Sequence, residues 1–130
     1  MTEGSDSALS ITVTEPSEGL FVVALAGDLD IASAAELSPR LAGIAVNAAV
    51  RVVVDVSGLA FIDSSGLNAL VIGARAVEAE GGWMVVAGPS EHIARVFEVV
   101  RLADSVEVEA SMLEALRRAE TGSAIEQIGP

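Results

Sequence analysis

The first apolar pattern along the chain is an alternation. Apolar residues at positions 9, 11 and 13 alternate with serine or threonine at positions 10, 12 and 14, which predicts a half-buried strand. A turn segment with proline and glycine, residues 15–19, leads into an apolar run at 20–26 that does not alternate. Such a run is typical of a strand covered on both faces, and so short a connection predicts an antiparallel hairpin.

Helical and strand patterns then alternate to the end of the chain. They predict helix 33–48, strand 51–56, helix 65–80, strand 83–87, helix 90–100, strand 106–108 and helix 111–119. This order predicts an α/β fold: a mixed, mostly parallel sheet of about five strands that opens with an antiparallel hairpin and is flanked by about four helices. We expect one domain at 9–119 between flexible tails at 1–8 and 120–130.

The start of the first helix can be interpreted in two ways. Ser33 and Glu36 form a capping-box pattern, which makes Ser33 the N-cap and places Pro39 beyond the first turn, where it should distort the helix. The alternative is a later start, with Ser38 as N-cap and Pro39 at the first helical position. We favour Ser33.

The corner between strand 51–56 and the next helix carries two adjacent serines. A helix N-terminus offers unpaired N–H groups and the positive end of the helix dipole. We expect Ser65 to be the N-cap and Ser64 to be exposed, because the periodic run begins at Leu67. A phosphate on Ser64 would suit the helix N-terminus but oppose Asp63, so we expect it to release a partner rather than refold the protein. The plainer interpretation is that the serines only cap the helix.

Four carboxylates are predicted near this corner. Asp28 and Asp30 leave the second strand, and Asp55 and Asp63 flank the end of the third, so all four should share one edge of the sheet with Ser64. One interpretation is a Mg²⁺ site with an aspartate phosphoacceptor. Hydrogen bonds in turns are the simpler explanation, and the absence of lysine from the chain weakens the first. We expect no metal.

Composition narrows the classes of function. A net charge of −12 and an aromatic content of 3% disfavour nucleic acid and anionic membranes as partners and suit a basic surface on another protein. The chain has no cysteine, an acidic N-terminus unlike a signal peptide, and no run long enough to span a membrane, so we expect a cytoplasmic protein. His92 is the single histidine and no nucleophile-elbow or phosphate-loop motif exists, so we expect neither an enzyme nor a cofactor.

Together these residues support a family resemblance. The run VVDVSGLAFIDSSGL at 53–67 resembles the signature of STAS domains, and most of all the free-standing anti-sigma factor antagonists of bacterial partner-switching systems. The acidic turn at 27–30 and the segment 95–102 resemble two further stretches of that family. The resemblance extends over about residues 9–118.

The resemblance implies a mechanism of transcription regulation, often in a stress response. The unphosphorylated antagonist binds an anti-sigma factor that is also a serine kinase, which frees a sigma factor. The kinase phosphorylates the first hydroxyl residue after the motif's aspartate, here Ser64 (less favoured, Ser65), binding is lost, and a serine phosphatase resets the switch. The implied partner-binding residues are Asp28, Asp30, Asp63, Ser64, Ser65, Gly66, Leu67 and Asn68.

The sequence also departs from the family pattern. Asn68 stands where many relatives have a small residue, and Val100-Arg101 replaces a frequent small-Gly pair, which predicts a longer third helix. Two alternatives stay open. The domain could be a non-switching scaffold or ligand-binding subunit of a stressosome or lipid-transport complex, or a small-molecule binder with its pocket at the strand ends.

Overall fold

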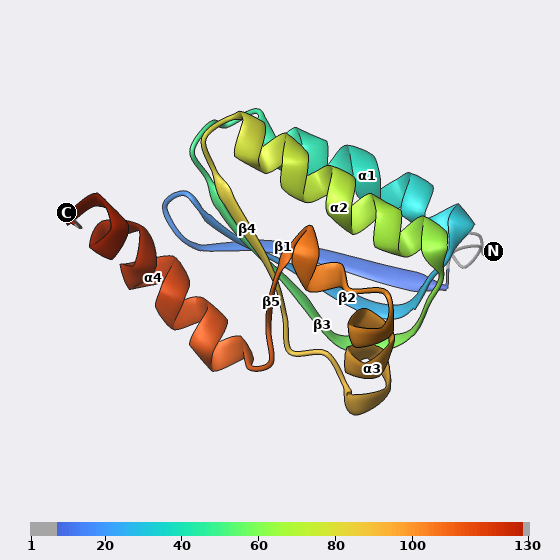
Figure 1. Ribbon diagram of the computed structural model, residues 1–130. Coiled ribbons are helices and arrows are strands. Elements are labelled where there is room, and N and C mark those ends of the chain that lie inside the picture. Colours follow the sequence, from blue (N-terminus) through green and yellow to red (C-terminus); the bar gives the residue numbers. More distant parts are fainter. Residues whose placement is uncertain (1–7, 129–130) are drawn as a thin grey trace.

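The computed structural model describes the backbone of residues 8–128 and the side chains of residues 8–120. It contains one five-stranded sheet in the order β1-β2-β3-β4-β5, with β1 and β2 antiparallel and all later pairs parallel, as predicted (Figure 1). The elements are β1 (Leu9–Ser17), β2 (Leu20–Leu29), α1 (Ile31–Ala45), β3 (Arg51–Ile62), α2 (Ser64–Ala79), β4 (Trp83–Ala87), α3 (Glu91–Val99), the 3₁₀ turn η2 (Leu102–Asp104), β5 (Glu107–Glu109) and α4 (Met112–Ile128).

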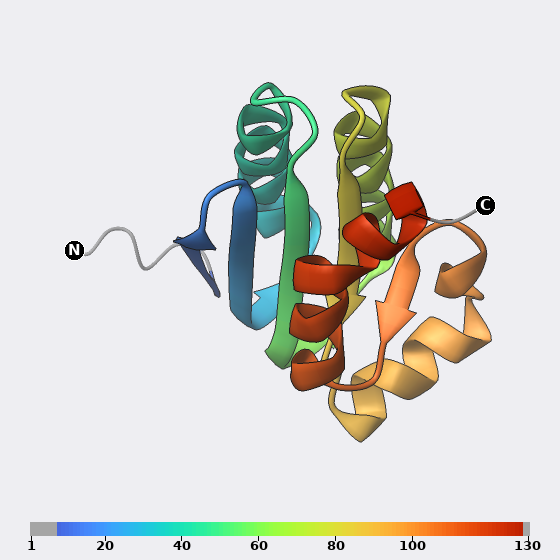
Figure 2. The same cartoon turned by 90° about the vertical axis from the view of Figure 1, so that its left-hand side faces the viewer.

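Both faces of the sheet are covered, which explains the continuous apolar runs of its inner strands. Val52, Val54 and Val56 of β3 pack into the larger core together with α1, α2 and α3. Val53 points to the other face and packs with Ala115 and Ala119 of α4 in a smaller core. Figure 2 shows α4 on the opposite side of the sheet from α1 and α2.

Helix α4 is longer than the sequence predicted. It runs to Ile128, so the expected helix end at about Ala119 is wrong. We expected a flexible tail from residue 120, but a single glycine, here at position 122, weakens a helix by only about 1 kcal/mol and need not end it. Arg51 anchors the helix by donating to the carbonyl of Ala119 at 2.6 Å. Of the predicted tails, 1–8 and 120–130, only residues 1–7 and 129–130 lie outside the described residues.

Strand β3 is also longer than predicted, and this extension positions the corner. It continues past 56 to Ile62 because its second half pairs with β2, where Gly58 lies opposite Ala26 and Ile62 opposite Leu29. A Cβ on Gly58 would lie 2.9 Å from the Cβ of Ala26, so the close pairing needs glycine there. The corner therefore lies beside the end of β2.

Helix α3 is not longer, contrary to the expectation from Val100-Arg101. It ends at Val99, and Arg101 adopts the left-handed conformation with φ 58° and ψ 47°. This is the position after a helix where glycine is usual. The turn after α3 thus forms with an arginine at the position where glycine is usual.

Candidate interaction site

Asp30 begins α1, and the prediction of Ser33 as N-cap is wrong. The Asp30 carboxylate accepts a hydrogen bond from the Ser33 N–H at 3.1 Å, and the Asp30 N–H donates to the Ser33 hydroxyl oxygen at 2.9 Å. The buried Ser33 hydroxyl also donates to the carbonyl of Asp28 at 2.9 Å, so Ser33 joins the end of β2 to the helix. The alternative start at Ser38 is excluded as well, because α1 passes through Pro39.

Hydrogen bonding also sets the charge state of Asp30. The backbone N–H of Ser33 contributes most and its hydroxyl second, and together they lower the pKa of the Asp30 carboxyl below its ordinary value. Asp30 therefore carries a negative charge next to the corner down to acidic pH.

Asp63 begins α2, so the prediction of Ser65 as N-cap is wrong too. The Asp63 carboxylate accepts the N–H of Gly66 at 3.1 Å, and its carbonyl accepts the N–H of Leu67 at 3.0 Å. Because an aspartate one residue earlier already caps the helix, neither serine is needed for that purpose.

The two serines are therefore the first two residues of α2. Ser64 is exposed, as predicted, and Ser65 is half-buried. Neither hydroxyl has a hydrogen-bond partner among the side chains of residues 8–120. At the N-terminus of α2, the unpaired N–H groups and the helix dipole favour a negative charge at this place.

The two helix starts are fixed to each other by backbone contact. Leu29 and Ile62 are register partners at the ends of β2 and β3, and the N–H of Asp63 donates to the carbonyl of Leu29 at 3.2 Å. Gly66 is buried here, and a Cβ on it would lie 2.7 Å from that same carbonyl oxygen. The corner is thus a rigid joint in which no side chain fits at position 66.

A shallow groove of about 270 Å³ runs between α1 and α2 beside the serines. Ser65 and Asn68 line it, together with Ile31 and Ile72, whose exposed fractions are 74% and 51%. Sequence reasoning missed both isoleucines. Ile72 lies off the apolar stripe that α2 buries, and an apolar residue outside such a stripe was the available signal.

Of the other predicted residues, Asp28, Leu67 and Asn68 lie at the corner, whereas Asp55 does not. Asp28 is half-buried at the end of β2, and Leu67 packs against the larger core while Asn68 is exposed. Asp55, in contrast, does not reach this edge: it pairs with Ala87 in the middle of the extended β3, and its carboxylate accepts the N–H of Ser57 at 2.9 Å. The predicted convergence of four aspartates is therefore wrong for Asp55.

Two further findings concern the described part of the chain. Among residues 8–120, no three histidine or acidic side chains lie together in a way that would hold a metal ion. None of the helices described is both long and apolar enough for a membrane span.

Comparison with known proteins identifies the family. The model of the STAS domain family matches residues 12–115. The chain belongs to the STAS domain family. An anti-sigma-B factor antagonist of Listeria monocytogenes is 24% identical to this STAS chain over 100 residues, which cover 77% of this chain and 88% of the relative.

Solved structures agree on the fold. The anti-sigma factor antagonist SpoIIAA in its unphosphorylated form has a TM-score of 0.67 at 22% identity, covering 85% of this STAS chain and 98% of that chain. The phosphorylated form of SpoIIAA from Bacillus has a TM-score of 0.65 at 24% identity, covering 84% and 98%. A sulfate transporter family protein of Wolinella succinogenes has a TM-score of 0.73 at 16% identity, covering 85% and 93%.

Proposed function

We propose that the protein is an anti-sigma factor antagonist that is switched by phosphorylation of Ser64. The unphosphorylated form binds an anti-sigma factor that is also a serine kinase, and this binding frees a sigma factor. A phosphate on Ser64 abolishes the binding, and a serine phosphatase restores it. The protein acts in the cytoplasm by binding alone, without catalytic groups or a cofactor.

The exposed hydroxyl of Ser64 carries this proposal. It has no hydrogen-bond partner among the described side chains and lies at the first residue of α2, so a kinase can reach it without disturbing the cap on Asp63. The Listeria relative supports the proposal in kind, since it is an anti-sigma-B factor antagonist, and the structural neighbour SpoIIAA has been solved in unphosphorylated and phosphorylated forms.

The surroundings of Ser64 explain how one phosphate could abolish binding. Ile31 and Ile72 offer apolar contact in the groove, and an apolar side chain of the partner would gain by filling it. Asp28 at the end of β2 and the capping residues Asp30 and Asp63 lie at the starts of the two helices, and their charges favour a basic partner surface. A phosphate adds about 1.5 to 2 negative charges, which must be desolvated against whatever covers the serine.

Labelling with kinase tests the site. Candidate anti-sigma kinases from the native host are incubated with ATP and with the wild-type, Ser64→Ala or Ser65→Ala protein, and the phosphate is located by mass spectrometry. We expect Ser64→Ala to lose the label and Ser65→Ala, the matched control one residue away, to keep it. Full labelling of Ser64→Ala would refute the assignment. A protein left unlabelled by a kinase that it binds tightly would favour the scaffold hypothesis.

Binding measurements test the surface. For the same kinase without nucleotide, we expect Ile72→Ala to weaken binding by about 5- to 30-fold, as for a central apolar contact. Val46→Ala is the matched control, because Val46 is 75% exposed but follows the far end of α1. Ser64→Glu should also weaken binding. Equal effects of Ile72→Ala and Val46→Ala would contradict the groove as the contact.

A further inference from the structure

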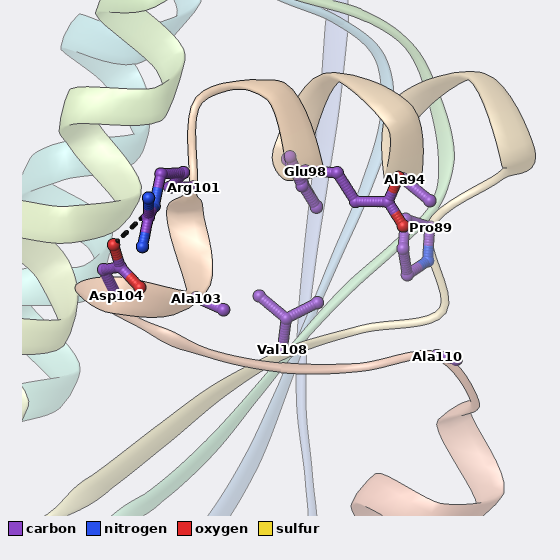
Figure 3. Close-up of a pocket in the computed structure, with 9 residues that line it drawn as sticks. Pro89, Ala94, Glu98, Arg101, Ala103, Asp104, Val108 and Ala110 are labelled. Carbon is purple, nitrogen blue, oxygen red and sulfur yellow. Dashed lines mark hydrogen bonds and ion pairs between the residues drawn. The ribbon is translucent and has the colours of Figure 1, made fainter.

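A second cavity lies between α3, η2 and the edge strand β5. Its volume is about 400 Å³, within the range of small-molecule sites. Its lining includes Ala94, Phe97, Glu98, Ala103, Val108 and Ala110 (Figure 3). None of these residues lines the groove beside Ser65.

Small side chains make this cavity. Ala94, Ala103 and Ala110 come from three different segments, and each leaves space that a larger residue would fill. Phe97 is buried and Val108 is half-buried, so they supply a firm apolar wall. The cavity is thus an apolar hollow open to solvent, suited to an aromatic or branched apolar group.

The charges at its rim are unequal. At one end, the Arg101 guanidinium binds the Asp104 carboxylate at 3.0 Å, and Figure 3 shows this pair on the side away from Pro89. At the other end, Figure 3 shows the carboxylate of Glu98 beside Ala94 and Pro89. Glu98 has no side-chain partner among residues 8–120. The rim therefore has one uncompensated negative charge.

The left-handed conformation of Arg101 is a second observation at the same place. An arginine there is strained relative to glycine, because its Cβ approaches the following carbonyl. Residues held in such conformations concentrate at functional sites. Here the conformation turns the chain from α3 into η2 and so forms the wall of the cavity that Arg101 and Asp104 line.

We propose that this cavity binds a small amphipathic amine. Its apolar body lies against the alanines and Phe97, and its ammonium group pairs with the carboxylate of Glu98. The strongly negative chain, with a net charge of −12, raises the local concentration of such cations. This binding site is independent of the Ser64 switch, because the two share no residue.

Titration of the full-length ¹⁵N-labelled protein followed by NMR tests the proposal. The probe is 2-phenylethylamine, and 3-phenylpropionate is the matched anion of similar shape. We expect the amine to shift the amide signals of the α3–β5 segment with a dissociation constant on the order of millimolar, as for a ligand of fewer than about a dozen heavy atoms. Equal binding of the anion, or no shift in this segment, would overturn the proposal.

Four substitutions sharpen the test. Glu98→Gln should weaken amine binding about three- to fivefold, the strength of a solvent-exposed ion pair. Glu91→Gln, on the same helix but outside the cavity lining, should not change it. Ala103→Leu should fill the cavity and abolish binding, and Ala110→Leu serves the same purpose if the first variant does not fold. Unchanged affinity in Glu98→Gln would also overturn the proposal.

Discussion

Replacing Gly66 by alanine should destabilise the protein, although alanine is the better helix former by about 1 kcal/mol. The new Cβ would lie 2.7 Å from both the carbonyl oxygen and the Cγ of Leu29, and 2.9 Å from the Cγ1 of Ile62. The carbonyl is backbone and also accepts the N–H of Asp63, so it cannot move without loosening the joint between β2 and α2. Overpacking of this kind costs about 2–3 kcal/mol, which leaves a net loss of about 1–2 kcal/mol.

Gly43→Ala is the matched control. Gly43 is also a helical glycine, but it is exposed in α1 and a Cβ on it would meet no atom within 4 Å. The same substitution should therefore stabilise the protein by about 0.5–1 kcal/mol. Urea unfolding of the two variants and the wild type measures both values. A Gly66→Ala protein as stable as Gly43→Ala would refute the claim that the joint is too close for a side chain.

Four further substitutions test local features by unfolding experiments. Asp63→Ala should cost about 1 kcal/mol through loss of the α2 cap, whereas Ser65→Ala should change stability by less than about 0.5 kcal/mol; the reverse order would restore Ser65 as the cap. The Asp30 carboxyl has its pKa lowered by folding, so its stabilisation is present above the ordinary value of 3.8 and is lost as the pH falls through the folded value. Stability of Asp30→Asn should therefore fall less steeply below pH 4 (about the ordinary aspartate pKa) than that of the wild type. Arg101→Gly should stabilise by about 0.5–1 kcal/mol, because relief of the left-handed strain exceeds the loss of the exposed pair with Asp104; a destabilised variant would contradict this.

The strand and helix order was predictable because burial patterns in this chain are clear. A β-branched run such as 51–56, with neighbouring residues buried on opposite faces, reads as an inner strand without knowledge of its partners. The second half of β3 was not predictable in this way. Exposed Ser57 and Gly58 look like a strand end, and only the pairing with β2 keeps them in the sheet. That pairing is a long-range contact, which local pattern does not reveal.

The candidate site was predictable in its position but not in its hydrogen bonds. Each helix start offers overlapping capping patterns, since Asp30 and Ser33 can both cap α1 and Asp63 and Ser65 can both cap α2. The ends of the strands decide which residue becomes the N-cap. Leu29 and Ile62 are register partners at the ends of β2 and β3, and the aspartate that follows each of them is the first residue outside the sheet. Prediction of the exposed isoleucines of the groove would have required knowledge of which face of each helix is buried.

This arrangement bears on how the proposed switch transmits its signal. A phosphate on Ser64 would gain about 0.3–1 kcal/mol from the helix N-terminus and lose a similar amount to the neighbouring Asp63 charge. The cap stays on Asp63 and the Ser64 hydroxyl has no described partner to give up, so neither the fold nor its stability should change much. The effect must then arise at the contact with the partner. There, apolar contact with the isoleucines of the groove would hold the partner's surface close to the added charge. A rigid joint at Gly66 suits this role, because it prevents the protein from relieving that repulsion by moving the serine away.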